Sequence, residues 1–254
     1  MRKVVRGTQV KDARSETIRY HEELYAQHSL FQSGTWLHKP ANYVMRAVEL
    51  LGTDSPKRVL DLGAGVGRHA IPIAQALPGG STVTAVDLLP SAIETMLQNA
   101  RDFGLDGRIQ GIVSDLEQFD IPRGEYDLII ACSVLEHVRS LEAFEGILES
   151  IQVGTAPGGL NCLVIGADRK EIDANGVSRD ALIELPLASE YVSRKLEGLY
   201  RDWQVIDKSV SNVAVVESRD DERYTLQSTC VRTLARRSPV DQIGNGASMS
   251  VFDT

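Results

Sequence analysis

Apolar and polar positions change their spacing in a regular order between residues 58 and 165. Short apolar runs of strand length alternate there with stretches whose apolar residues recur every three or four positions, which is the spacing of a helix face. The predicted strands are Val59–Leu62, Thr82–Val86, Arg108–Val113, Tyr126–Ala131 and Leu160–Ile165. The helices predicted after the first, second and fourth strands cover about residues 68–77, 90–100 and 141–151. This alternation predicts an α/β fold with a doubly wound, mostly parallel sheet.

The two ends of the chain differ from this block. Pro40 opens a helical pattern that Gly52 ends, and residues 17–52 are therefore expected to form an N-terminal helical cap. Residues 1–16 are polar and mostly basic, and they are expected to be a flexible arm. Residues 237–254 lack periodicity and are rich in Ser, Gly and Asn, which predicts a disordered tail.

Beyond residue 165 the alternation stops. The polar stretch at residues 166–190 is expected to be a cap insertion within a core that spans residues 53–236, and a helix is expected at about 189–200. Two strand-like runs follow, Trp203–Val216 and Tyr224–Leu234, with a short charged turn between them. A turn of this length predicts an antiparallel hairpin.

Composition and charge limit the class of protein. The 254 residues carry a formal net charge of −8, which argues against a nucleic-acid partner. The three cysteines are widely spaced and odd in number, which favours free thiols in a reducing cytosol over a disulfide framework or a zinc site. There is no apolar signal segment, and no apolar run approaches the ~20 residues of a membrane span. We therefore expect a cytoplasmic protein without a membrane partner or a metal site.

One stretch, Val59–Ala70, joins the first strand to a glycine-rich turn and the start of a helix. Glycines at 63, 65 and 67 allow positive φ angles and a close approach of a ligand to the backbone. The helix that follows points its free N–H groups toward the same place, which predicts a nucleotide-like ligand at the carboxyl edge of the sheet. The dinucleotide fingerprint G-x-G-x-x-G does not fit, because Arg68 stands where its third glycine is required.

Acidic residues stand at three successive strand ends. At Asp61, just before the first glycine, a carboxylate would repel a pyrophosphate but attract the cationic amino group of S-adenosylmethionine. Asp87 can accept hydrogen bonds from both ribose hydroxyls, and Asp115 can accept one from the adenine amino group. Together these carboxylates favour a cationic, phosphate-free cofactor over a dinucleotide.

With these motifs in order, residues 58–165 resemble the core of the class I S-adenosylmethionine-dependent methyltransferases of the small-molecule type. The matching sequences are Val59-Leu60-Asp61-Leu62-Gly63-Ala64-Gly65-Val66-Gly67, Ala85-Val86-Asp87, Ser114-Asp115, Tyr126-Asp127-Leu128-Ile129-Ile130-Ala131-Cys132-Ser133-Val134-Leu135-Glu136-His137 and Pro157-Gly158-Gly159-Leu160. The resemblance implies a Rossmann-like methyltransferase fold whose seven-stranded sheet is completed by the C-terminal hairpin. It also implies S-adenosyl-L-methionine as cofactor and S-adenosyl-L-homocysteine as product.

The same resemblance implies which residues bind the cofactor. The glycine turn would hold its methionine end, with the amino group at Asp61. The ribose would lie at Asp87, the adenine at Asp115 and the sulfonium near Cys132. Cys132 is expected to be a small buried residue rather than a nucleophile, and His137 either contacts the adenosine or makes a local hydrogen bond. The full predicted set is Asp61, Gly63, Ala64, Gly65, Asp87, Leu88, Asp115, Leu116, Cys132, Ser133 and His137.

Recognition of the methyl acceptor is expected from residues 17–43 and from the insertion. Trp36, Tyr25 and Phe31 could cover the sulfonium and the acceptor, since an aromatic face near a cation is favourable, and His28 or His38 could act as a base. Of these, Trp36 and His38 are the candidate catalytic residues. The sequence Ala131-Cys132-Ser133-Val134 stands where an Asn-Pro-Pro-Tyr-type tetrad would be expected in enzymes that methylate a flipped-out base or an amide nitrogen.

The sequence thus predicts an enzyme that transfers a methyl group from S-adenosylmethionine to a small-molecule acceptor by in-line displacement. Two alternatives stay open. The chain could be a non-catalytic or regulatory S-adenosylmethionine-binding protein, or a methyltransferase that acts on a macromolecule. Oxygen, nitrogen, sulfur and carbon acceptors are all compatible with these motifs.

Overall fold

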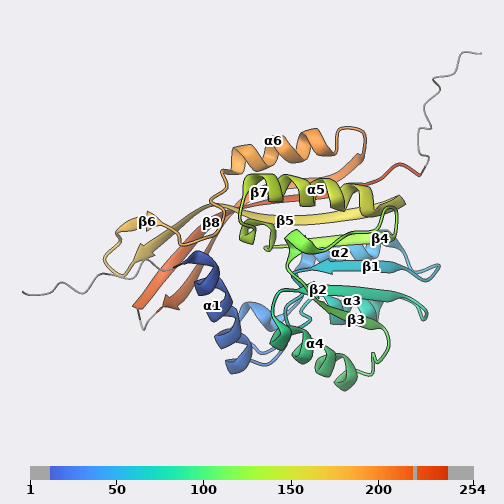
Figure 1. Cartoon of the computed structure of the whole chain (residues 1–254), viewed down its shortest axis with the longest axis horizontal. Helices are drawn as coiled ribbons and strands as arrows, with labels where there is room; N and C mark the ends of the chain where they lie inside the picture. The colour runs from blue at the N-terminus through green and yellow to red at the C-terminus, as the bar shows by residue number, and fades with distance from the viewer. Residues whose placement is uncertain (1–11, 220–221, 240–254) are drawn as a thin grey trace, which may run out of the picture.

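The computed structural model describes residues 12–219 and 222–239, which form one sheet with helices on both faces (Figure 1). In chain order, with η for 3-10 helices, the elements are α1 (Ala13–Gln27), η1 (Trp36–His38), α2 (Asn42–Leu51), β1 (Arg58–Leu62), α3 (Ala70–Ala76), β2 (Thr82–Asp87), α4 (Pro90–Asp102), β3 (Ile109–Val113), η2 (Leu116–Gln118), β4 (Tyr126–Cys132), η3 (Leu135–His137), α5 (Leu141–Gly154), β5 (Thr155–Asp173), β6 (Ser178–Asp180), α6 (Ser189–Leu199), β7 (Gln204–Arg219) and β8 (Glu222–Arg236). The strand order is β3-β2-β1-β4-β5-β8-β7, and β6 pairs with β5. The first five strands of this order run parallel, whereas β8 and β7 are antiparallel. The predicted doubly wound, mostly parallel seven-stranded sheet with a C-terminal hairpin is confirmed.

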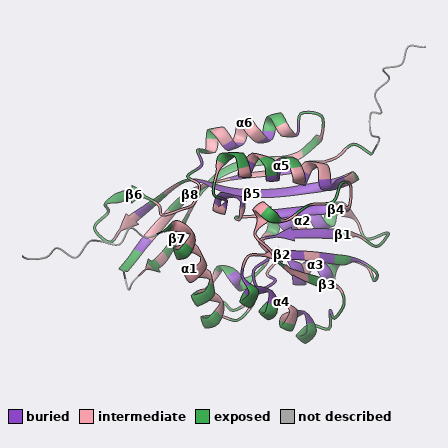
Figure 2. Ribbon diagram, in the orientation of Figure 1, coloured by how far each residue is buried: buried purple, intermediate pink, exposed green. Residues whose placement is uncertain are grey.

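Alternate residues of the central strands pack on opposite faces of the sheet. Val59 of β1 belongs to the core under α2, α3 and α4, whereas Leu60 belongs to the core under α5 and α6. The central strands are buried on both faces (Figure 2), which explains their nearly continuous apolar runs. The two cores fix the carboxyl ends of the parallel strands at one edge of the sheet.

The strand after α5 is much longer than its apolar run predicts. β5 continues to Asp173 instead of ending at Ile165, so residues 166–173 of the predicted insertion belong to the sheet. This extension pairs with β8 as far as Tyr224 and with the short strand β6. The charged residues of this segment lack the apolar pattern that predicts a strand. They can lie in a strand because their partners are on neighbouring strands; Lys170, for example, pairs with Asp180 at 2.5 Å.

Regular structure begins earlier and ends later than predicted. Asp12 caps α1, because its carboxylate accepts a hydrogen bond from the Ser15 N–H at 3.0 Å, so residues 12–16 are not part of a flexible arm. At the other end, the N–H of Arg237 donates to the Gly159 carbonyl at 2.8 Å, which places residue 237 against the sheet. The rest of the predicted arm (residues 1–11) and of the predicted tail (residues 240–254) lies outside the described residues.

Helix α1 lies beside the extended ends of β7 and β8, in front of the carboxyl edge of the sheet (Figure 1). None of its residues is buried, and Figure 2 shows it in the colours of partly and fully exposed residues. Polar and aromatic contacts therefore hold α1 in place, in contrast to α2 to α6, each of which buries an apolar face.

Candidate functional site

A cavity of about 380 Å³ opens at the carboxyl ends of the parallel strands. We divide it into two halves. The strand-end half is lined by the turns that follow β1 to β4, namely Gly63–Val66, Asp87–Leu89, Asp115, Leu116, Cys132–Val134 and His137. The ribbon half is lined by residues of α1 between Arg14 and His21, of β5 between Gly166 and Glu171, of the loop 181–184, and of β7 and β8 between Val213 and Cys230.

The turn after β1 presents its backbone to the strand-end half. Gly63 and Gly65 have φ angles of 71° and 53°, which residues with a Cβ adopt only with strain. A Cβ on Gly65 would lie 2.5 Å from the phenol oxygen of Tyr25, and one on Gly63 would lie 2.7 Å from the Cβ of Val134. The backbone conformation and the close packing of Tyr25 and Val134 therefore both require glycine here, and the turn contributes to the cavity wall.

Asp87 lines the cavity at the end of β2, with Leu88 beside it. Its carboxylate oxygens accept hydrogen bonds from the N–H groups of Gly65 at 2.8 Å and Leu89 at 3.0 Å. Burial raises the pKa of Asp87, and these amide hydrogen bonds act in the opposite direction. A carboxylate has about four acceptor sites, so Asp87 keeps acceptor capacity for ligand hydroxyls.

Asp115 and Leu116 line the cavity after β3, and two arginines already bind Asp115. Its Oδ2 accepts hydrogen bonds from Arg14 of α1 and from Arg139, each at 2.8 Å. Arg14 also donates to the backbone carbonyl of His137 at 2.7 Å. These contacts fasten the first turn of α1 to the strand-end half.

Cys132 and Ser133 line the cavity at the end of β4. Ser133 has a φ of 54°, which is uncommon for a residue with a side chain, and such conformations concentrate at functional sites. Burial raises the pKa of the Cys132 thiol to about 12, so this thiol is uncharged at neutral pH. A thiolate nucleophile at this position is therefore disfavoured.

His137 lines the cavity and makes a hydrogen bond that the sequence did not predict. Its Nδ1 lies 2.9 Å from Oε2 of Glu184, a residue 47 positions away. The side chain thus faces the cavity, and its partner is a distant carboxylate rather than a local group.

Asp61 is a predicted cofactor residue that the structure does not bring to the cavity. It is only 1% exposed and does not line the cavity, because it shares its face of β1 with Val59 and bonds to the backbone N–H of Ala70. Its Oδ2 has no hydrogen-bond partner among the described residues. Burial and then the charge of Asp87 raise the pKa of Asp61 to about 7. Asp61 thus lies under the glycine turn and not on the cavity wall, and its predicted contact with the amino group, directly or through a water, stays a prediction.

The two predicted catalytic residues have different positions. Trp36 lines the cavity, and its ring lies near Tyr25 and His21, with centroid distances of 6.2 and 6.4 Å. His38 is exposed and does not line the cavity. The preceding residue, Leu37, is fully buried, so the backbone turns the His38 side chain outward. The prediction of His38 as the base is therefore wrong in its geometry.

Sequence analysis missed Glu184, which is 4% exposed and lines the ribbon half. It accepts hydrogen bonds from His137 and from the Thr17 hydroxyl of α1, the latter at 3.2 Å. Its sequence signal is an acidic residue inside the apolar run Leu182–Leu185, because a buried carboxylate needs partners and is costly without them.

Sequence analysis also missed Arg169. The pairing of β5 with β8 is interrupted between residues 167 and 170, and Asp168 has a φ of 47° there. Within this bulge, Arg169 lines the cavity and pairs with the fully buried Glu136 at 2.5 Å. Bulges often redirect side chains next to active sites, and this one turns a cation into the ribbon half. The bulge leaves no mark on the local sequence pattern.

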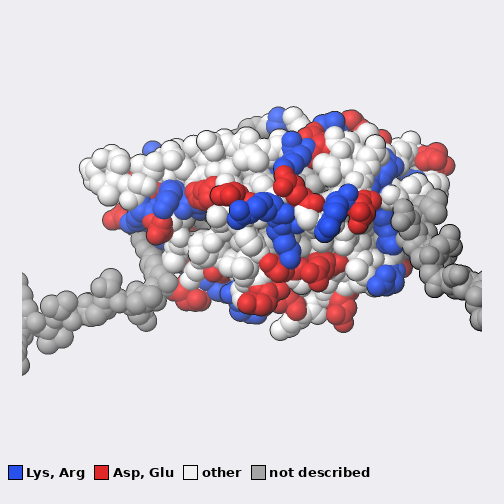
Figure 3. Space-filling model, turned by 90° about the horizontal axis from the view of Figure 1, so that it is seen from above, with Lys and Arg blue, Asp and Glu red and all other residues white. Residues whose placement is uncertain are grey.

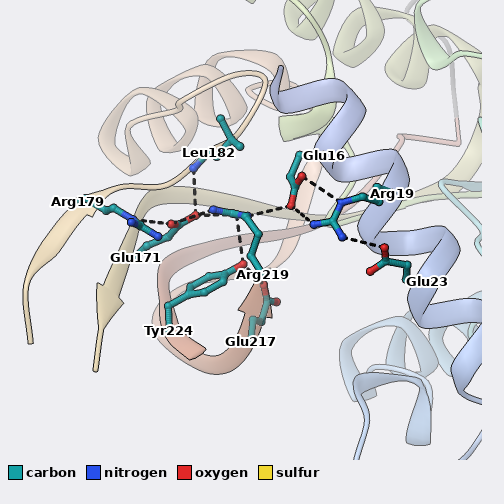
Figure 4. Close-up of polar contacts among 9 residues, drawn as sticks. All are labelled: Glu16, Arg19, Glu23, Glu171, Arg179, Leu182, Glu217, Arg219 and Tyr224. Carbon is teal, nitrogen blue, oxygen red and sulfur yellow. Dashed lines mark hydrogen bonds and ion pairs between the residues drawn. The ribbon is translucent and has the colours of Figure 1, made fainter. Parts of the chain in front are cut away.

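Glu171 connects β5, β7 and α1 at the far end of the ribbon half (Figure 4). It is 2% exposed and accepts hydrogen bonds from Arg219 at 2.8 and 3.1 Å, from Arg179 at 2.9 Å and from the Leu182 N–H at 3.3 Å. Arg219 also pairs with Glu16 of α1 at 3.0 Å. Ion pairs therefore fasten the first turn of α1 to the ribbon half through Glu16, as Arg14 fastens it to the strand-end half.

Two further properties concern the part of the chain that the structure describes. Among residues 12–219 and 222–239, no group of three or more His, Cys, Asp or Glu side chains is placed to hold a metal ion. Within the same ranges, no helix combines the length and the apolar character needed to cross a membrane.

Comparison with known proteins matches the centre of the chain to a family. Residues 59–159 fit the family described as methyltransferase domain. Hemagglutinin 1 of Eikenella corrodens is 27% identical over 193 residues, which are 74% of this chain and 57% of that protein. The ubiquinone biosynthesis O-methyltransferase of Rickettsia conorii is 36% identical over 97 residues, which are 38% of this chain and 32% of that protein. The chain thus spans less than two thirds of the length of either relative.

A solved structure with a similar fold is TehB from Haemophilus influenzae. Its TM-score is 0.61 at 20% identity, over 86% of this chain and 66% of that one. At this identity the likeness concerns the fold, and it agrees with the observed strand order. The family match, the strand order and the glycine turn at the strand ends lead to one conclusion: this chain contains a class I S-adenosylmethionine-dependent methyltransferase domain.

Proposed function

We propose that this chain is a methyltransferase that transfers the methyl group of S-adenosylmethionine to a small-molecule acceptor. The observation that carries the proposal is the cavity itself. Ten of the eleven predicted cofactor residues line it, and it continues without a break into the ribbon half. One space therefore offers room for a methyl donor beside a second molecule.

In this function the strand-end half binds the cofactor. The backbone of Gly63–Gly65 on the cavity wall would hold the methionine end, the free acceptor capacity of Asp87 would take the ribose hydroxyls, and Asp115 with Leu116 would border the adenine. Arg14 and Arg139 fix the Asp115 carboxylate for this task. When bound, the cofactor supplies an activated methyl group on a sulfonium centre.

The ribbon half would align the acceptor and exclude water, which is the main requirement of an in-line displacement. Trp36, Tyr25 and His21 form an aromatic cluster between the two halves, and an aromatic face stabilises a nearby cation. The cavity of about 380 Å³ falls within the usual range of small-molecule sites, roughly 300–1,000 Å³.

The surface and one relative favour a small acceptor over a macromolecule. On the face shown in Figure 3, basic and acidic side chains are intermingled, whereas nucleic-acid binding requires a continuous basic stripe. The Rickettsia conorii relative is named for O-methylation in ubiquinone biosynthesis, which supports a metabolite as acceptor.

Calorimetry with S-adenosylmethionine and S-adenosylhomocysteine tests the proposal. We expect one ligand per chain, no binding of NAD, and at least about tenfold weaker binding by Asp87→Ala, because a hydrogen bond to a charged group contributes about 1.5–3 kcal/mol. The exposed Asp202→Ala is the matched control and should bind as the wild type does. Absence of binding would refute the cofactor assignment. Binding without methylation of any compound in a metabolite extract, followed with a labelled methyl group, would instead favour a non-catalytic role.

A further inference from the structure

We propose that His137, held by Glu184, is the general base that removes the proton from a hydroxyl group of the acceptor. The acceptor class is therefore an alcohol or a phenol, and the reaction is an O-methylation. This inference rests on the proposed function.

The geometry fixes the tautomer of His137. Its Nδ1 lies 2.9 Å from Oε2 of Glu184, and a carboxylate can only accept, so Nδ1 carries the hydrogen. Nε2 is then the unprotonated nitrogen, and no described residue is hydrogen-bonded to it. The side chain is 17% exposed and lines the cavity, so Nε2 is available to a ligand there.

Glu184 is itself fixed as a carboxylate. Burial alone would raise its pKa, but the hydrogen bonds from His137 and from the Thr17 hydroxyl help to lower it overall. Its other oxygen, Oε1, is buried and has no hydrogen-bond partner among the described residues. A carboxylate in this setting stabilises an imidazolium that forms beside it, which is the role of the acid in hydrolase triads.

The neighbouring His21 provides a contrast. Its ring lies 6.2 Å from that of His137, and its Nδ1 lies 2.8 Å from the Thr17 carbonyl, so it lacks a carboxylate partner. Burial lowers the pKa of His21 to about 4, and this histidine stays neutral near pH 7. Of the two rings, only His137 is hydrogen-bonded to a carboxylate.

The charged and titratable groups around His137 come from three elements. Glu184 approaches from the loop after β6, His21 from α1, and Arg169 from the bulge in β5. Arg14 of α1 binds the backbone carbonyl of His137 and links it to Asp115. Of these groups, Glu184 makes the direct hydrogen bond to the imidazole.

A histidine–carboxylate pair matters most for a hydroxyl acceptor. A thiol has a pKa of about 8.5 and supplies its own thiolate, whereas a phenol near 10 and an aliphatic alcohol above it stay protonated at neutral pH. A neutral amine attacks through its lone pair and loses its proton afterwards. A positioned base contributes about 10²–10⁴-fold where the proton must leave during the reaction.

In the methyl-transfer step, proton transfer accompanies the formation of the oxygen–carbon bond. The acceptor oxygen gives its proton to Nε2 of His137 and forms a bond to the methyl carbon. The carbon–sulfur bond breaks, and its electron pair remains on sulfur. The products are a methyl ether and S-adenosylhomocysteine, and the imidazolium of His137, paired with Glu184, then releases its proton to water.

The test uses the whole chain, labelled S-adenosylmethionine and three probes of one shape: catechol, 1,2-diaminobenzene and benzene-1,2-dithiol. We expect methylation of catechol, with a kcat that His137→Gln lowers by about 10²–10⁴-fold and Glu184→Gln by about 10–100-fold. Glu184→Asp, which restores a carboxylate, should recover part of the rate. The exposed Glu190→Gln is the matched control.

The pH profile separates a catalytic role from a structural one. In the wild type, kcat for catechol should fall on the acid side, and Glu184→Gln should move this limb to lower pH because the imidazolium has lost its carboxylate. Methylation of the diamine or the dithiol alone, methylation of no probe by a protein that binds S-adenosylhomocysteine, or equal rates of Glu184→Gln and Glu190→Gln would overturn the inference. Failure to bind S-adenosylhomocysteine would refute the proposed function instead, so the two failures are distinguishable.

Discussion

The strand-end half and the ribbon half of the cavity are built in different ways. The strand-end half consists of turns that directly follow β1 to β4, so the register of the parallel sheet places its residues. The ribbon half joins α1 to β5 and to the hairpin of β7 and β8 through side chains. The Thr17–Glu184 hydrogen bond, for example, connects residues 167 positions apart.

Because the two halves are built differently, substitutions in them change different parts of the structure. Altering the strand-end half means altering a backbone that the two hydrophobic cores fix in place. Altering the ribbon half means exchanging polar side chains on a helix that buries none of its residues. The ribbon half can therefore vary in its side chains while the strand-end half keeps its backbone, and three variants test this contrast.

The largest effect on ligand binding is expected from Gly63→Ala in the strand-end half. The positive φ and the contact with Val134 should abolish measurable binding of S-adenosylhomocysteine and lower the free energy of unfolding by about 1–3 kcal/mol. Gly146→Ala in α5 is the control. No atom lies within 4 Å of its new methyl group, so this variant should bind S-adenosylhomocysteine normally. Its free energy of unfolding should rise by about 0.5–1 kcal/mol. Calorimetry measures the binding of both variants, and denaturant unfolding measures their stability. Normal binding of S-adenosylhomocysteine by Gly63→Ala would contradict a site formed by the backbone of this turn.

Asp61→Asn tests the support beneath the same turn. Because the pKa of Asp61 is raised from 3.8 to about 7, the folded protein keeps a proton that the unfolded chain loses. Its contribution to stability is full below pH 4 and is lost as the pH rises through 7. The free energy of unfolding of Asp61→Asn, taken relative to that of the wild type, should therefore rise by up to about 4 kcal/mol as the pH goes from 4 to 8.

Denaturant unfolding without ligand at several pH values measures this difference, with the exposed Asp202→Asn as the control. A difference that is constant with pH would show that the folded protein does not raise the pKa of Asp61.

A smaller effect is expected from Glu171→Gln in the ribbon half. Burial would raise the pKa of Glu171, but Arg219, the Leu182 N–H and Arg179 lower it overall. The carboxylate therefore stabilises the fold above about pH 4.5, and this contribution is lost as the pH falls through the lowered pKa. At pH 7 the variant should lose roughly 1–3 kcal/mol in denaturant unfolding and keep its affinity for S-adenosylhomocysteine within about twofold. A collapse of that affinity would mean that the two halves are not independent.

The predicted strand ends illustrate what a sequence pattern can place. Asp87, Asp115 and Ser133 line the cavity as expected, because each stands at the last residue of a strand or just beyond it, and the strands are parallel. Asp61 was predicted from the same logic and lies elsewhere. It precedes the last residue of β1, so the alternation of the strand directs it under the turn, toward the Ala70 N–H.

The ribbon half shows where the pattern fails. The charged residues of 166–173 predicted part of a cap insertion, yet they form a strand because Arg219, Arg179 and Asp180 supply partners from other elements. The predicted base, His38, was chosen for its residue type in a segment expected to cap the site, and the burial of Leu37 turned it away.

The sequence by itself determined the parallel sheet, its glycine turn and most of the residues that line the strand-end half, because strand periodicity and backbone conformation are local properties of the chain. Only the tertiary structure decided that His137 meets Glu184, that a bulge turns Arg169 into the cavity, and that α1 covers the site. These contacts join side chains far apart in sequence, and their energies depend on burial and distance, which no local pattern encodes.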